Sequence, residues 1–182
     1  MKPNFTFGNV LLRKAQCKYS NKTTRYKKSP ALKELEKRSL EAKQQKYPNN
    51  PYLVGDSFED RTANGLTKAI IAYIRLNGGQ AERISTTGRP IDKTKTFTDV
   101  IGRSRTIGRV EWIPGAGTNG SADISATING RSVKIEIKIG NDRQGQAQKE
   151  YQKAIQTAFG IYYIARTFEC FVSWYQETFE KP

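Results

Sequence analysis

Residues 128–140 read INGRSVKIEIKIG, and this stretch decides the fold. From Val133 to Ile139, apolar residues alternate with lysine and glutamate, which predicts a strand with one apolar and one charged face. The preceding Asn129-Gly130 is typical of a type I′ turn, because both central positions of that turn need positive φ. The sequence therefore predicts a β-hairpin centred on Asn129-Gly130.

The hairpin register brings acidic residues together. A two-residue turn pairs Ile124 with Ile135, so that apolar residues meet on one face. On the other face Asp123 lies opposite Glu136, and like charges directly opposite each other destabilise a sheet. Either the surface tolerates this cost, or both carboxylates hold a cation. Lys138 lies one step further along the same face, and two carboxylates beside a lysine suit Mg²⁺ chemistry.

Composition limits the classes of function. The 182-residue chain carries a formal charge of +14, with a pI near 9.8, which favours a polyanionic partner such as nucleic acid. It contains no histidine, which excludes imidazole metal sites and histidine general bases. A catalytic metal here must therefore be a hard cation with oxygen ligands. No long apolar segment is present, so we expect a soluble, cytoplasmic protein.

The positive charge is concentrated at the N-terminus. Residues 1–50 contain thirteen Lys and Arg against three Glu. Ser29-Pro30 predicts the start of a helix that runs to about Gln45, with a thin apolar stripe. We therefore expect residues 1–50 to form a basic arm, partly helical or disordered, and residues 51–182 to form the compact domain.

Periodicity and turn residues give the elements of that domain. We expect helices over 58–77 and 143–159 and a third helix capped by Thr167. Strands are expected over 80–85, 105–112 and 161–165 in addition to the hairpin, and the polar residues 86–101 predict a loop.

Three segments together carry a resemblance to a known family. GSADI (120–124), IEIK (135–138) and NDRQGQAQKEYQ (141–152) resemble the PD-(D/E)xK nuclease superfamily, and within it the VRR-NUC group of small structure-specific nucleases. The resemblance covers about 56–175 and is most specific over 117–165. It departs from the family pattern at Ala122, which stands where the proline of the family name would be.

The resemblance implies a fold and an activity. The fold would be α/β with a restriction-endonuclease-like core, in which helices flank a mixed central sheet in the order α-β-β-β-α-β-α, here with a basic N-terminal extension. The activity would be that of a Mg²⁺- or Mn²⁺-dependent endonuclease that hydrolyses phosphodiester bonds in DNA. Structured or branched DNA in recombination, repair or mobile-element replication would be the substrate, and a homodimer is the expected assembly.

The resemblance also implies roles for single residues. Asp123, Glu136 and the backbone carbonyl of Ile137 would bind the metal, whereas Lys138 would orient water or stabilise charge on the phosphate. Gln148 on the following helix would position a water or a phosphate oxygen. A first-helix glutamate often completes the site in this superfamily. Glu59 is the expected residue, with Glu82 as the alternative.

Each candidate residue also has a simpler interpretation. The acid pair can be an ordinary polar strand face, Gln148 an exposed helix residue, and Glu59 a partner of the helix dipole. Candidate nucleic-acid contacts, which can equally be solvated side chains, are Arg103, Arg105, Arg109, Lys14, Lys27 and Lys28. The competing functions are a non-catalytic nucleic-acid-binding module and a ribosome-associated RNA-binding protein.

Overall fold

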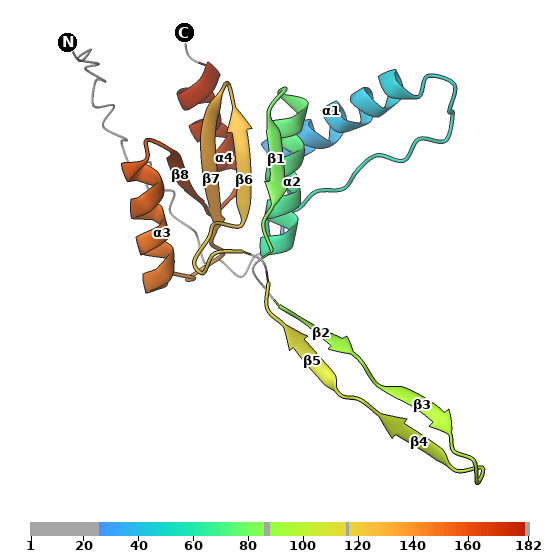
Figure 1. The fold of residues 1–182 in the computed structure, drawn as a ribbon. Helices are drawn as coiled ribbons and strands as arrows, with labels where there is room; N and C mark the ends of the chain where they lie inside the picture. The colour runs from blue at the N-terminus through green and yellow to red at the C-terminus, as the bar shows by residue number, and fades with distance from the viewer. Residues whose placement is uncertain (1–25, 86–87, 116, 181–182) are drawn as a thin grey trace, which may run out of the picture.

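The computed structural model describes residues 26–85, 88–115 and 117–180. The fold is mixed α/β, with a four-stranded sheet flanked by helices and a long ribbon that projects from one end (Figure 1). The elements are α1 (Pro30–Lys46), α2 (Ala63–Leu76), β1 (Gln80–Arg83), β2 (Arg89–Asp92), β3 (Lys95–Thr98), β4 (Ser104–Ile107), β5 (Val110–Ile113), β6 (Ile124–Ile128), β7 (Arg131–Ile137), α3 (Gln146–Thr157), β8 (Ile161–Ala165), α4 (Phe168–Tyr175) and a terminal π-helical turn, η1 (Gln176–Glu180). This order differs from the predicted one, because α1 precedes it and four strands are inserted after β1.

The central sheet has the strand order β1-β6-β7-β8. The β1–β6 and β6–β7 pairs are antiparallel, whereas β7 and β8 are parallel. The predicted hairpin is confirmed. Ile124 pairs with Ile135, and Asn129 and Gly130 have φ values of 48° and 75°, as a type I′ turn requires.

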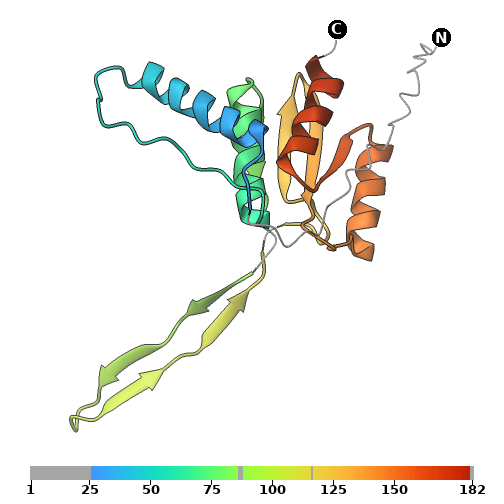
Figure 2. The same ribbon diagram turned by 180° about the vertical axis from the view of Figure 1, so that it is seen from behind.

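The helices cover the two faces of the sheet unequally. Figure 2 shows α4 in front of β6 and β7, with α1 and α2 on the same side, whereas α3 lies beside β8. The apolar core therefore lies between the sheet and α1, α2 and α4. At its centre the ring of Tyr73 makes edge-on contacts with Phe168, Phe171 and Tyr175, at centroid distances of 5.2–5.9 Å. The opposite face of the sheet carries Asp123 and Glu136.

The first helix belongs to the compact domain, which corrects the predicted boundary at residue 50. Ser29 caps α1 as expected, because its Oγ accepts the N–H of Leu32. Leu32 and Leu35, however, are fully buried in the same core cluster as α2 and α4. The thin apolar stripe is sufficient because α1 buries only one narrow edge against two other helices.

The predicted starts of the other helices differ in accuracy. Thr167 caps α4 as predicted. The helix expected over 58–77 begins only at Ala63, after its cap Thr62, and the one expected from 143 begins at Gln146. Within the described part of the chain, none of the helices combines the length and the apolar character that a membrane span needs.

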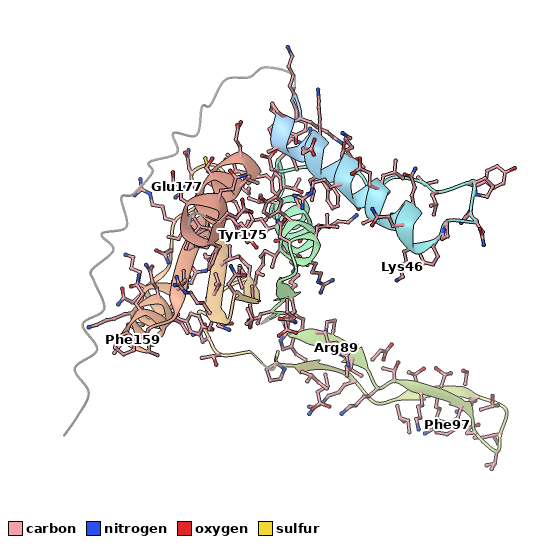
Figure 3. The ribbon with its side chains drawn as sticks, turned by 90° about the horizontal axis from the view of Figure 1, so that it is seen from above. Lys46, Arg89, Phe97, Phe159, Tyr175 and Glu177 are labelled. Atoms are coloured by element: carbon pink, nitrogen blue, oxygen red, sulfur yellow. The ribbon has the colours of Figure 1, made fainter. Side chains whose placement is uncertain are left out.

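Residues 88–113 form a projecting antiparallel ribbon, so the loop predicted over 86–101 and the single strand over 105–112 are both wrong for the described residues. β2 pairs with β5 and β3 pairs with β4. The ladders are separated at Gly108, whose φ is +100° and where a Cβ would come within 2.2 Å of the Lys93 carbonyl oxygen. Figure 3 shows Arg89 near the base of the ribbon and Phe97 towards its far end.

Candidate functional site

Asp123 lies at the end of the sheet, directly before β6. Its carbonyl oxygen accepts the N–H of Ile84 at 2.8 Å, which ties it to the chain leaving β1. Its carboxylate oxygen Oδ2 accepts the N–H of Ile137 on β7 at 2.9 Å. The hairpin register therefore holds the Asp123 side chain beside β7, as the sequence predicts.

Glu136 is the most deeply buried acid of the site, with only 2% of the residue exposed. Its Oε1 lies 3.2 Å from Nζ of Lys138 and also accepts a hydrogen bond from Nε2 of Gln148. Its Oε2 is buried and has no hydrogen-bond partner among the described residues. Burial, and secondly the negative charge of Asp123, raise the pKa of Glu136 above its ordinary value.

The free oxygen of Glu136 fits a cation. A buried polar atom without a partner costs free energy, and the cost is larger when the group is charged. A hard divalent cation would satisfy Oε2 and offset the repulsion from Asp123. The carbonyl of Ile137 is directed to the same place, because the N–H and C=O of one strand residue point the same way and that N–H reaches Asp123. The residues present therefore fit the expected metal.

Lys138 supplies the positive charge of the site. It is only 6% exposed, and its Nζ lies 3.2 Å from both Glu136 and Asp142. Sequence analysis did not assign Asp142 to the site. Its spacing of four residues from Lys138 was the available signal, but the chain is not helical there, so that spacing alone does not predict the contact.

Gln148 is held in place by two hydrogen bonds of its side-chain amide. Its Oε1 accepts the N–H of Gly145 at 3.0 Å, which leaves Nε2 directed at Glu136. The backbone around Gln148 is in turn packed against Gly120, where an added Cβ would lie 2.5 Å from the Ala147 carbonyl oxygen. The glycine of GSADI thus allows α3 to approach the acid pair.

Tyr162 on β8 lies near Glu136 and was not assigned to the site by the sequence analysis. Tyr162 pairs with Lys134 across β7 and β8, and its hydroxyl accepts a hydrogen bond from Gln144 at 3.4 Å. Burial, and secondly the charge of Glu136, raise the pKa of Tyr162 to about 12. Tyr162 is therefore a neutral hydrogen-bonding group at physiological pH. Tyr162 could have been assigned to the site only from the parallel pairing of β7 with β8.

The structure does not bring Glu59 to the acid pair. Glu59 precedes the cap of α2, and its Oε1 accepts the hydroxyl of Thr62. The alternative, Glu82, is exposed on β1 and pairs with Ser125. Among residues 26–85, 88–115 and 117–180, no three acidic, cysteine or histidine side chains form a metal-binding group. The candidate carboxylate ligands for a metal are thus Asp123 and Glu136, without a third from α2 or β1.

The candidate nucleic-acid contacts occupy separate places. Arg103 and Arg105 lie near the tip of the ribbon and Arg109 lies in its middle. Lys28 forms an ion pair with Glu36, whereas Lys27 is exposed. Lys14 lies outside the described residues.

Comparison of the chain with models of known protein families and with curated protein sequences gives no match.

Proposed function

We propose that this protein is a Mg²⁺- or Mn²⁺-dependent endonuclease that hydrolyses phosphodiester bonds in structured or branched DNA. The observation that carries the proposal is the buried Glu136, whose Oε2 lacks a partner while Asp123 and Lys138 lie next to it. The element order gives further support. Without α1 and the ribbon, the order α2-β1-β6-β7-α3-β8-α4 agrees with the order expected from the resemblance.

The bound metal would polarise the scissile phosphate and lower the pKa of a coordinated water. Asp123, Oε2 of Glu136 and the Ile137 carbonyl would hold it. Lys138 has three N–H donors, of which two are directed at Glu136 and Asp142. The third can donate to the attacking water or to a phosphate oxygen as negative charge develops.

Gln148 would act as a positioning residue. Its amide nitrogen fixes Oε1 of Glu136, so the other oxygen of that carboxylate faces the metal position. Burial of this oxygen also keeps bulk water from it, which strengthens its attraction for a cation.

A non-catalytic DNA-binding module is the second candidate, and the net charge of +14 is the observation that favours it. Phosphate binding alone does not require a buried carboxylate beside the DNA. Such a group repels phosphate and costs desolvation free energy unless a cation balances it. The buried Glu136 beside Asp123 therefore favours catalysis.

The test is cleavage of labelled duplex, flap and four-way-junction DNA with Mg²⁺, Mn²⁺ or EDTA. Asp123→Asn and Glu136→Gln should each abolish divalent-dependent cleavage, while DNA affinity stays equal or rises because a negative charge is removed. Lys138→Met should also abolish cleavage but weaken binding. Misfolding lowers activity and affinity together, so these opposite effects on affinity identify the site.

The matched control is Glu150→Gln, which removes an exposed carboxylate from α3. It should cut as the wild type does. Wild-type protein that binds these substrates but cuts none of them, and whose melting temperature ignores Mg²⁺ and Mn²⁺, would support the non-catalytic module instead.

A further inference from the structure

The projecting ribbon has one basic face. Arg89 pairs with Ile113 and Lys95 pairs with Ile107, so one register runs through both ladders. Paired residues share a face and successive residues alternate between faces. All Lys and Arg of the ribbon occupy odd-numbered positions and therefore belong to the same face: Arg89, Lys93, Lys95, Arg103, Arg105 and Arg109.

The opposite face of the outer ladder has no charged residue. It carries only hydroxyl side chains: Thr96, Thr98, Ser104 and Thr106. The hydroxyls of Thr96 and Thr106 lie 3.0 Å apart across the ladder. The segregation of charge is therefore a property of the ribbon rather than of the chain's average composition.

The tip of the ribbon exposes two apolar residues on a fixed loop. Val100 and Ile101 are 105% and 69% exposed. Asp99 holds the loop, because its Oδ1 accepts the N–H groups of Ile101 and Arg103 at 3.1 and 2.9 Å. Its Oδ2 accepts Nε of Arg105 at 3.1 Å. The two apolar side chains are thus presented to solvent in a preorganised loop, which lowers the entropic cost of binding.

The charge of the basic face indicates which kind of partner binds it. Glu111 neutralises Lys93 and Asp99 neutralises Arg105, but no ion pair among the described residues involves the other four basic residues, Arg89, Lys95, Arg103 and Arg109. Two copies that met through this face would bring like charges together, whereas a polyanion complements it.

Size also suits duplex DNA. From Arg89 to Ile101 the strand spans roughly 40 Å at about 3.3 Å per residue, slightly more than one turn of B-DNA, which is about 34 Å. Architectural proteins bind duplex DNA through basic residues and insert apolar side chains between base steps from the minor groove. An isolated two-stranded ribbon is marginally stable in water, so bound DNA would also stabilise it.

We infer that the ribbon is a DNA-clasping arm whose basic face lies along the phosphates and whose tip, Val100-Ile101, inserts between adjacent bases. The inference rests on DNA being the substrate of the proposed function and adds how that substrate is distinguished. Separating stacked bases costs free energy, and the cost is lowest where stacking is already interrupted. The arm therefore selects DNA with a flap, junction or mismatch over continuous duplex.

The experiment measures binding without cleavage. Full-length Glu136→Gln protein in EDTA is titrated with a flap DNA and a continuous duplex, each labelled with 2-aminopurine, whose fluorescence rises when the base unstacks. We expect a larger rise on the flap DNA. Adding Val100→Ser with Ile101→Ser should abolish the rise and lower flap affinity about tenfold, since two apolar side chains no longer leave water.

Charge and tip are tested separately. Lys95→Ala, Arg103→Ala and Arg109→Ala together should reduce the slope of log affinity against log salt by about 3 and keep the fluorescence rise at saturation. Two control pairs should behave as the parent protein: Thr98→Ala with Ser104→Ala on the opposite face, and Tyr52→Ser with Val54→Ser, two exposed residues outside the ribbon.

The outcomes separate this inference from the proposed function. Binding with a fluorescence rise that ignores the tip substitution would overturn the inference and leave the nuclease proposal standing. If the fluorescence rise depended on the tip but the wild-type protein never cut DNA, the inference would stand and the nuclease proposal would be wrong. If the tip substitution left the fluorescence unchanged but converted a dimer to a monomer in sedimentation, the arm would be an interface between copies, and the inference would be wrong.

Discussion

Gln148 and Lys138 share one oxygen of Glu136. Both Nε2 of Gln148 and Nζ of Lys138 contact Oε1, whereas Oε2 has no partner among the described residues. The carboxylate is thus held on one side and left free on the other. A purely structural salt bridge would gain more if both oxygens were satisfied, so the asymmetry supports the proposed metal position.

Replacing Gln148 should weaken the site without unfolding the protein. Gln148→Leu removes the amide that orients Glu136, and loss of such an orienting partner typically lowers metal affinity or activity about 10- to 100-fold. Isothermal titration with Mn²⁺ and a cleavage assay measure the two effects. Gln146→Leu, on the exposed side of the same helix turn, is the control and should leave both unchanged. If both variants lost metal affinity and cleavage equally, any substitution in this turn of α3 would disturb the site, and Gln148 would have no special role.

The apo protein should gain stability when Glu136 becomes neutral. Because the folded state raises the pKa of Glu136, folding disfavours the charged form, and stability falls as pH rises from the ordinary carboxylate pKa through the raised value. In EDTA, Glu136→Gln should therefore unfold at higher denaturant concentration than the wild type at pH 8, and this difference should shrink towards pH 4. Glu150→Gln controls for the change in net charge.

Divalent ions should reverse that ranking. Metal binding requires the ionised carboxylate, so the rise in wild-type melting temperature caused by Mn²⁺ should grow with pH and should be lost in Glu136→Gln. A variant that kept the full metal-induced rise would place the ion elsewhere.

Gly120 should be needed for activity although it bears no functional group. Gly120→Ala introduces a side chain at φ +77° and brings its Cβ against the backbone of Ala147 and Gln148. The backbone strain costs about 1–3 kcal/mol, and the clash displaces the first turn of α3 from Glu136. Gly78→Ala is the matched control, because φ is +80° there but no atom lies within 4 Å. Both variants should lose stability, and only Gly120→Ala should lose cleavage per folded molecule.

Two N-terminal truncations should behave differently. Deleting residues 1–25 removes six Lys and Arg and no acid, so DNA affinity and its salt dependence should fall. Deleting residues 1–50 also removes Leu32 and Leu35 from the core. Since each large-to-small change at such a position costs about 2–5 kcal/mol, this shorter protein should melt far lower or fail to fold. Equal melting temperatures of the two truncated proteins would contradict the assignment of α1 to the core.

The features that could be predicted from sequence are those fixed by short-range signals. Asn129-Gly130 determined the turn, and with it the pairing of Ile124 with Ile135 and the proximity of Asp123 to Glu136. The boundaries of β8 and the cap at Thr167 were equally local. In each case a turn or capping residue stands directly beside a clear apolar pattern, so no tertiary information was needed.

The missed features depend on contacts between distant segments. The core role of Leu35 requires α2 and α4, which lie far along the chain, and its weak apolar stripe resembles that of a solvated helix. The ribbon was missed because its strands bury no face against the sheet, so no alternation of apolar and polar residues marks them. Glu59 was assigned to the site on the expectation of a helix that in fact begins after it.

The hydrogen bond from Ile84 to Asp123 joins the two ends of the inserted ribbon next to the acid pair. Because this hydrogen bond already holds the two ends of the ribbon together, residues can be added or removed between them at little cost to the stability of the sheet. Each pair of residues added to the ladder would carry the tip about 3.3 Å further from Asp123 and Glu136. The ribbon would thus act as a ruler, whose length sets how many base pairs separate the inserted tip from the cut. Shortened ribbons should shift the cleavage position along the DNA while the chemistry of the cut stays the same.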